Sequence, residues 1–520
     1  MGYPRILRYV PLCFLISVVS CNQSTQEKSD IQASGKLPNI IYVLADDLGY
    51  GDVSSFNGRG KIKTPNLDQL AAEGMKFIDA HTSSAVCTPT RYGIMTGRYN
   101  WRSRLKSGVL GGTSPALISQ DRSTVASMLK AHGYHTAFIG KWHLGWNWSM
   151  DENKKIDFSK PVTHTPNDLG FDYAYGHSGS LDMAPYVYVE DGMATAVPTD
   201  TTENRDFQGF WRKGLTAPDF IHEDVTPNFF RRAISYVEER SKESNPFFLY
   251  LPLPSPHTPI LPTEEWQGKS ELNPYGDFVI MIDAYMGKLM QAVKDAGVEE
   301  NTLIIFTSDN GCSPRAKYDE LIEKGHNPSH IFRGHKADIF EGGHRVPFIT
   351  RWPRVIEPGT ITGETICTTD LMATCAEIIS YQLKDNEGED SFSLLPLFRQ
   401  VQLTAPVREA TVHHSINGSF AIRKGKWKLI LCPGSGGWSA PKPNADETAE
   451  LPPIQLYDIS IDPEERRNVH AENPEIVNEL RQLLIKYVED GRSTPGAKQS
   501  NHGTERWPQL DRIYEMQAES

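Results

Sequence analysis

The strongest constraint on the fold is an alternation of short apolar segments with helix-like segments along the first 400 residues. Residues 39–44 are almost continuously apolar, as expected of a strand that is buried on both faces. Further strands are expected at 135–139, 247–251, 302–306 and 346–352. Helices are expected at 64–72, 124–131 with Ser123 as the cap, 226–240, 275–296 and 369–380. The alternation predicts an α/β fold in which helices cover a mostly parallel sheet.

The pattern changes after about residue 405. Short strands are expected close together at 411–415, 420–423 and 427–431, which indicates an antiparallel sheet. A terminal helix is expected over 473–489. We therefore predict a large domain over residues 38–405 and a smaller C-terminal α+β domain over residues 406–520.

The N-terminus has the features of an export signal. Two arginines precede an apolar stretch, residues 9–19, that is too short to span a bilayer, and Val18-Val19-Ser20-Cys21 is typical of a lipobox. These features predict a lipoprotein signal peptide over 1–20, a lipid on Cys21 and a flexible tether over 21–37. The protein is then expected to be exported, either to the periplasm or to the outer membrane and cell surface. As a lipoprotein it would contact the membrane only through the lipid. The alternative is an ordinary secretory signal in which Cys21 is incidental.

Composition excludes some classes of protein and restricts the cysteines. The net charge of −12 argues against a nucleic-acid binder, and a mean hydropathy of −0.44 argues against a polytopic membrane protein. Of the 7 cysteines, Cys13 would leave with the signal peptide and Cys21 would carry the lipid. The remaining number is odd, so at least one thiol is unpaired, and Cys87 is the candidate. A structural zinc site has no support, because no two cysteines have CxxC spacing.

Polar side chains follow the predicted parallel strands at their carboxyl ends, where α/β proteins bind ligands. These residues are Asp46, Asp47, Lys141, His143, His257, Asp309 and Asn310. The three aspartates and the asparagine offer hard oxygen ligands, which suit Ca²⁺ or Mg²⁺ and not zinc. Adjacent carboxylates also repel one another unless a cation or a proton neutralises them. The alternative is that each acid caps a helix or pairs with an arginine.

Cys87 begins the stretch Cys87-Thr88-Pro89-Thr90-Arg91. Pro89 is suited to the first turn of a helix, which places Cys87 near a helix N-terminus that attracts anions. Arg91, one turn later, could hold an oxyanion or the nucleophile itself. This environment makes Cys87 a candidate thiolate. A buried structural cysteine is the alternative.

The motif Cys87-x-Pro89-x-Arg91, with the following Thr96-Gly97-Arg98, resembles the signature of type I (formylglycine-dependent) sulfatases. Further stretches that resemble this arylsulfatase-like family lie at 133–143, 333–347 and 456–464. The matches occur in the family's order and span roughly residues 38 to 470. The chain therefore resembles a bacterial carbohydrate sulfatase.

The resemblance implies an alkaline-phosphatase-like fold, with residues 38–405 as the catalytic domain. It also implies that Cys87 is oxidised to 3-oxoalanine (formylglycine) by a formylglycine-generating or an anaerobic sulfatase-maturating enzyme. The hydrated aldehyde, a gem-diol, would be the nucleophile. Its second hydroxyl can expel sulfate, an exit that a thiolate would not have.

The resemblance also implies individual roles. The metal, Ca²⁺ rather than Mg²⁺, would be held by Asp46, Asp47, Cys87 as formylglycine, Asp309 and Asn310. Asp309 would help to deprotonate the attacking hydroxyl, and Arg91 and Lys141 would stabilise negative charge. His143 would take a proton when the sulfated intermediate collapses. His257 and Lys336 would contact the sulfate and assist the leaving alcohol.

The alcohol is expected to be part of a sulfated glycan or a polysaccharide-derived oligosaccharide. Residues 180–186 resemble segments of bacterial glycan sulfatases, with a lean towards galacto-configured sugars. The candidate substrate-binding residues are Ser180, Asp182, Tyr186 and His413. Loops at 146–166, 178–211, 312–330 and 413–438 are expected to read the sugar, and they contain Tyr188, Trp211 and Trp438 as further platforms. Two alternatives stay open: a phosphodiesterase or phosphonate monoester hydrolase of the same superfamily, and a non-catalytic glycan-binding lipoprotein.

Overall fold

The computed structural model describes residues 1–2, 36–503 and 508–518. The predicted signal peptide, the lipid-bearing Cys21 and the tether lie almost entirely outside these described residues. From Pro38 to Ser520 the chain forms one compact unit. Among the described residues, no helix has the length and apolar character needed to cross a bilayer.

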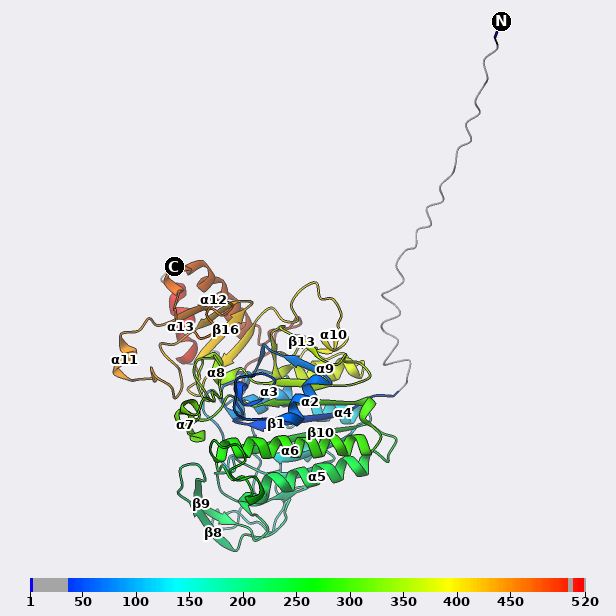
Figure 1. The fold of residues 1–520 in the computed structure, drawn as a ribbon. Helices are drawn as coiled ribbons and strands as arrows, with labels where there is room; N and C mark the ends of the chain where they lie inside the picture. The colour runs from blue at the N-terminus through cyan, green and yellow to red at the C-terminus, as the bar shows by residue number, and fades with distance from the viewer. Residues whose placement is uncertain (3–35, 504–507, 519–520) are drawn as a thin grey trace. The chain divides into compact units, whose positions relative to one another are not determined.

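A ten-stranded sheet forms the framework of this unit (Figure 1), in the order β13-β2-β12-β11-β1-β10-β4-β5-β6-β7. Its parallel centre consists of β11 (Thr302–Ser308), β1 (Asn39–Asp46), β10 (Phe247–Pro256), β4 (His135–Lys141) and β5 (Tyr173–His177). In the register of the sheet, Val43 of β1 lies between Leu251 of β10 and Phe306 of β11. Every residue of β10 and β11 is buried, which explains why these segments read as continuous apolar runs.

The strands become antiparallel towards both edges of the sheet. On one side these are β12 (Phe348–Arg351) and β2 (Met75–Phe77), with β13 (Thr360–Thr362) running parallel to β2 at the edge. On the other side, β6 (Val189–Glu190) and β7 (Met193–Ala194) extend β5 as antiparallel strands. The prediction of a mostly parallel sheet is therefore confirmed for the centre, which is the part that carries the strand-end residues.

Helices cover both faces of this sheet (Figure 1). The long helices α5 (Val225–Arg240) and α6 (Pro274–Asp295) lie side by side on one face, and α3 (Cys87–Thr96), α4 (Val125–Ala131) and α9 (Leu371–Ile378) lie on the other. The short helix α2 (Pro65–Ala72) packs against α6. The predicted helices are all present. The predicted cap of α4 is wrong, because Thr124 rather than Ser123 accepts the backbone N–H of Ser127.

A second, antiparallel sheet follows the large one in the chain. It consists of β15 (Thr411–His414), β16 (Phe420–Lys424), β17 (Trp427–Ile430) and β18 (Gln455–Asp458), and α12 (Pro474–Glu489) and α13 (Pro508–Ala518) follow it. The three predicted strands and the terminal helix are confirmed, and β18 is an additional strand. The hydrophobic core of this region also contains Tyr99 and Trp101 from the earlier part of the chain. The predicted domain division near residue 405 stays a prediction.

The described chain also contains further short strands and α-helices. They are β3 (Ala80–His81), β14 (Ile366–Cys367), β8 (Asp200–Asn204), β9 (Trp211–Thr216), α7 (Tyr318–Glu323), α8 (Glu341–His344), α10 (Leu395–Phe398) and α11 (Asp446–Ala449). Strands β3 and β14 pair with each other, as do β8 and β9.

Candidate active site

The carboxyl ends of the central parallel strands bring the predicted polar residues to one edge of the sheet. Asp46 ends β1, Lys141 ends β4, and His257 directly follows β10. Asp309 and Asn310 follow β11, which pairs with β1 up to the register position Ala45–Ser308. The shared strand direction thus places residues from distant parts of the sequence around one point.

Buried ion pairs connect the three aspartates to three cationic side chains. Arg91, from α3, donates through Nε and Nη2 to Asp309 Oδ2 at 3.0 and 2.8 Å, and through Nη2 to Asp46 Oδ2 at 3.2 Å. Lys141 Nζ also contacts Asp46 Oδ2. Lys336 Nζ lies 2.6 Å from Asp47 Oδ1. These pairs offset the charge of the carboxylates and hold their orientation.

The carboxylates differ strongly in their affinity for a proton. Burial favours the neutral form of Asp46, but Lys141, His257 and Arg91 outweigh burial and hold its pKa well below the usual range. For Asp309, burial and the neighbouring charge of Asp46 raise the pKa to about 7 despite Arg91. The cluster therefore favours neutralisation of one acid by a proton or by an additional cation, as the sequence predicts.

Three buried oxygen atoms of this cluster have no hydrogen-bond partner among the described residues. They are Asp46 Oδ1, Asp47 Oδ2 and Asn310 Oδ1. The other oxygen of each aspartate pairs with a lysine or arginine, and Asn310 uses its Nδ2 to donate to Asp47 Oδ1 at 2.7 Å. Each unsatisfied acceptor costs about 1–3 kcal/mol, a cost that a coordinated cation removes. An all-oxygen donor set fits a hard divalent cation such as Ca²⁺ or Mg²⁺.

Cys87 lies at the same place, as the first residue of α3. Its sulfur and carboxylate oxygens of Asp46 and Asp309 lie within 4.8 Å of one another. The predicted position at a helix N-terminus is therefore confirmed. The predicted thiolate is wrong for the unmodified residue, because burial raises the pKa of the Cys87 thiol more than Lys141 and Lys336 lower it. Cys87 forms no disulfide within the described chain.

His143 is held in one tautomer with a free ring nitrogen. Its Nε2 lies 2.8 Å from the carbonyl oxygen of Leu110, so Nε2 carries the hydrogen and donates it. Nδ1 is buried and has no partner among the residues that the structure describes. Burial, together with Lys141 and Arg91, lowers the pKa of His143 well below the ordinary value. The ring is thus neutral, with a lone pair available to accept a proton.

Ser180 connects Lys141 and His257. Its Oγ lies 3.3 Å from Lys141 Nζ and 3.3 Å from both ring nitrogens of His257. His257 Nε2 also lies 3.7 Å from Asp47 Oδ2, and burial together with Lys336 lowers the pKa of His257. The structure therefore brings Ser180 and His257 into the same cluster as the predicted metal ligands.

The remaining predicted substrate-binding residues near Ser180 have different surroundings. Asp182 pairs with Arg212 of β9, a residue that the sequence analysis did not single out. Tyr186 is only 1% exposed, and its hydroxyl donates to the carbonyl oxygens of Asp182 and Arg212 at 3.2 and 2.6 Å. The prediction that Tyr186 contacts a sugar is thus wrong, and Tyr188 is buried in the same way. Trp438 is 41% exposed, and its contact with a sugar stays a prediction.

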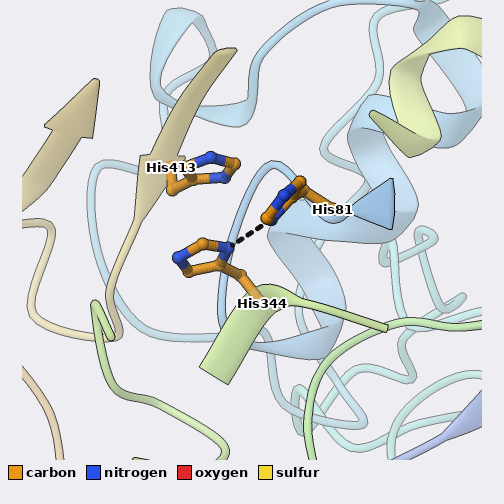
Figure 2. A group of neighbouring side chains, drawn as sticks. All are labelled: His81, His344 and His413. Atoms are coloured by element: carbon orange, nitrogen blue, oxygen red, sulfur yellow. Dashed lines mark hydrogen bonds between the residues drawn. The ribbon is translucent and has the colours of Figure 1, made fainter. Parts of the chain in front are cut away.

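His413 lies in a separate buried cluster with His81 and His344 (Figure 2). The rings of His413 and His344 stack with centroids 3.9 Å apart and planes 9° apart, and His81 Nδ1 lies 3.1 Å from His344 Nδ1. His413 Nδ1 donates to the carbonyl oxygen of Thr82 at 2.9 Å. All three histidines have no exposed surface, so the predicted contact of His413 with substrate is wrong.

The hydrogen bonds of this cluster indicate neutral imidazoles and not a metal site. Lys428 Nζ, which can only donate, lies 3.0 Å from His344 Nε2, so the hydrogen of His344 is on Nδ1 and points to His81. His81 Nε2 lies 3.0 Å from Asp79 Oδ1 and 3.0 Å from Arg423 Nη1, so both charged groups contact this nitrogen. The parallel rings of His344 and His413 cannot both direct a lone pair at one ion. The cluster instead braces the segment that begins at Thr82 and leads to Cys87.

We expect this cluster to make the free energy of unfolding depend on pH. Burial lowers the pKa of His81, His344 and His413, whereas an unfolded histidine titrates near 6.5. The charged groups that face these rings are Asp79, Glu341, Arg423 and Lys428. Below that pH the unfolded chain binds protons that the folded chain does not, so the free energy of unfolding falls as the pH falls from 7 to 5.

The variant His413→Asn keeps a hydrogen-bond donor towards Thr82. We expect it to reduce the slope of the unfolding free energy against pH by the amount that corresponds to about one proton. Denaturant unfolding at pH 5, 6 and 7 measures the slope for both proteins. An unchanged slope in the variant would show that His413 is protonated in the folded state.

Comparison with known proteins gives a consistent result along the chain. The sulfatase family model, described as "Sulfatase", matches residues 38–381. The chain is 34% identical to an N-acetylgalactosamine-6-O-sulfatase of Bacteroides thetaiotaomicron, over 92% of this chain and 98% of that protein. It is 32% identical to human arylsulfatase A, over 91% and 92% of the two chains. A solved structure from work on the metabolism of multiple glycosaminoglycans by B. thetaiotaomicron superposes with a TM-score of 0.76 at 31% identity, covering 87% of this chain and 99% of the other.

Proposed function

The chain belongs to the sulfatase family and is a sulfuric ester hydrolase with the expected alkaline-phosphatase-like fold, and we propose that it hydrolyses sulfate esters of a glycan or a glycan-derived oligosaccharide. The observation that carries the proposal is the convergence of Cys87 with three unsatisfied buried oxygens at the strand ends. The similarity to an N-acetylgalactosamine-6-O-sulfatase supports a carbohydrate substrate and the lean towards galacto-configured sugars.

The family uses formylglycine, and we propose that Cys87 is the residue converted. A formylglycine-generating or an anaerobic sulfatase-maturating enzyme would carry out the conversion. The modified residue supplies a hydroxyl nucleophile through its hydrated aldehyde. The raised pKa of the Cys87 thiol supports this proposal, since an unmodified, neutral thiol is a poor nucleophile.

The family also uses a divalent metal, and Asp46, Asp47, Asp309 and Asn310, together with residue 87, are the proposed ligands. Ca²⁺ is preferred to Mg²⁺ in this proposal. When bound, the cation supplies positive charge next to a sulfate oxygen and the nucleophile. The fit rests on the unsatisfied oxygens of Asp46, Asp47 and Asn310.

The other side chains would divide the remaining work. Asp309, whose pKa is raised by burial, is suited to accept the proton of the attacking hydroxyl. Arg91 and Lys141 would hold negative charge in a region that excludes water. His143 would accept a proton at its free Nδ1.

On the leaving-group side, His257 and Lys336 would contact the sulfate and assist the departure of the alcohol. Ser180 would orient both Lys141 and His257 through its hydroxyl. Export and a lipid anchor at Cys21 fit an enzyme that meets extracellular glycans, and they remain part of the proposal.

The test compares esters that differ only in the transferred group. We expect matured, metal-loaded enzyme to hydrolyse an aryl sulfate and a sulfated sugar, and to act on the matching phosphate mono- and diesters and phosphonate esters much more slowly. Higher kcat/KM for a phosphorus ester would favour the phosphodiesterase or phosphonate hydrolase alternative. Binding of sulfated glycan without turnover by fully converted protein would favour the glycan-binding lipoprotein.

A further inference from the structure

A cavity with a positively charged lining lies outside the proposed catalytic cluster. Its volume is about 460 Å³, within the range typical of small-molecule sites. The lining includes Arg98, Arg104, Arg122, His164 and His502, and no aspartate or glutamate is among its described residues. Because the whole chain carries a net charge of −12, a lining of this sign is a local exception. An anion is therefore the class of ligand that the cavity would attract.

Arg104 contributes a charge that no acid offsets. Its Nη2 donates to the carbonyl oxygens of Pro115 and Ala116 at 2.9 and 3.0 Å, and no carboxylate of the described chain pairs with it. These contacts use only one of its three nitrogens, so Nε and Nη1 keep their hydrogens for a ligand. The side chain is exposed, which leaves it accessible from solvent.

Arg98 and Arg122 share a single acid. Glu389 Oε1 lies 3.1 Å from Arg98 Nε and 2.7 Å from Arg122 Nη1, and the side chain of Glu389 has no exposed surface. One carboxylate can offset only one of the two guanidinium charges. Arg122 uses Nη1 for both of its contacts within the described chain, to Glu389 and to the carbonyl oxygen of Asn386. Its Nε and Nη2 therefore remain available to donate.

His164 adds a neutral donor to the same lining. Asn147 Oδ1 accepts the N–H of Ala116 at 3.2 Å, which directs Asn147 Nδ2 towards His164 Nδ1 at 3.2 Å. Because Nδ1 accepts this hydrogen bond, the ring hydrogen is on Nε2. No side chain or carbonyl of the described residues accepts from Nε2. The cavity thus combines two guanidinium groups and one imidazole with unused N–H groups.

We propose that this cavity is an accessory site for a sulfate or carboxylate group of an anionic glycan, separate from the ester that is hydrolysed. Arg104 and Arg122 donate to the oxyanion, and His164 donates to a hydroxyl of the same sugar. The choice of a glycan as the source of the anion rests on the proposed function. The cavity lies near the catalytic residues, because the N–H of Leu117 in its lining donates at 2.8 Å to the carbonyl oxygen of Leu144, which directly follows His143.

The test measures the binding of dextran sulfate to the full-length, metal-loaded protein, with dextran as the uncharged control polymer. Wild type should bind the sulfated polymer and not dextran. Arg104→Ala should weaken this binding by roughly tenfold, the lower end of the range for a hydrogen bond to a charged group, because the side chain is exposed. Its kcat/KM for an aryl sulfate should change by less than about twofold, since the cavity is separate from the reacting ester. Arg104→Lys, which keeps the charge, should recover part of the lost affinity.

A matched control and a second probe separate this site from other sources of binding. Arg205 is 83% exposed and pairs with Glu203, so Arg205→Ala should change neither the binding nor the rate. Equal losses of affinity in Arg104→Ala and Arg205→Ala, or no loss in Arg104→Ala, would overturn the accessory site. Inorganic sulfate that binds through Arg104 as tightly as the polymer would overturn the glycan as its ligand. Wild type that binds the polymer through Arg104 but hydrolyses no sulfate ester would contradict the proposed function and support the accessory site.

Discussion

Replacing Cys87 by alanine is expected to abolish the turnover of every sulfate ester while the protein stays folded. The variant removes the thiol that the maturation enzyme would oxidise, so the aldehyde and its hydrated nucleophile cannot form at position 87. Loss of a catalytic nucleophile typically reduces kcat by ~10⁴-fold or more. The fold should tolerate the change, because only a sulfur atom is removed at the first turn of α3. We expect a loss of about 1–2 kcal/mol in the free energy of unfolding.

The matched control is Cys375→Ala. Cys375 is also fully buried, but it lies on α9, and burial alone accounts for the raised pKa of its thiol. This variant should keep its activity. Mass spectrometry of the peptide that contains residue 87 should show conversion of the thiol to the aldehyde in active wild type. Full activity in a preparation that contains only unmodified cysteine would contradict the proposed nucleophile.

The sequence predicts the centre of the fold well because the central strands are buried on both faces. Runs such as 39–44 and 302–306 have no polar side to obscure them. The strand β5 (Tyr173–His177) was not predicted, since it is five residues long and contains a glycine and a histidine. The strands β6 and β7, which end one side of the sheet, have two residues each, too few to produce a pattern.

The sequence predicts which residues meet at the site where their positions follow from the direction of the parallel strands. Parallel strands must place their carboxyl ends together, so Asp46 and Asp309 could be expected to meet although they are far apart in the sequence. The charge state of Cys87 could not be predicted in the same way. A helix N-terminus favours a thiolate, but the opposing cost of burial depends on the three-dimensional surroundings.

The substrate side of the site was the least predictable part. Adjacent histidines such as His413 and His414 carry no sequence signal that separates a buried network from a binding surface, and both are buried. Arg212 gave no signal because it is an isolated arginine, paired with Asp182 only through the folding of the intervening loop. A buried carboxylate that follows a predicted substrate-binding serine by two residues could have prompted a search for such a partner.

Removal of the metal is expected to eliminate activity and to lower the melting temperature without unfolding the protein at room temperature. The unsatisfied oxygens of Asp46, Asp47 and Asn310 lose the partner that the cation provides. A ligand present at 1,000 times its Kd stabilises by about 4 kcal/mol, so the melting temperature of a unit of this size should fall by roughly 4 °C. The ion pairs of the aspartates with Arg91 and Lys336 remain, and they keep the demetallated protein folded.

Two variants show whether these oxygens are the ligands. Asn310→Ala removes one unsatisfied oxygen and should weaken metal binding, so that more Ca²⁺ is needed to restore both the rate and the melting temperature. Asp283→Asn is the control, because Asp283 is a buried acid of α6 that accepts from Asn66 and the N–H of Leu67. It should bind metal as wild type does, even if it is less stable. Elemental analysis would verify that the protein is exhaustively demetallated. If this protein kept its full rate, the oxygens at the strand ends would serve another purpose, because leaving them unsatisfied would then have no catalytic consequence.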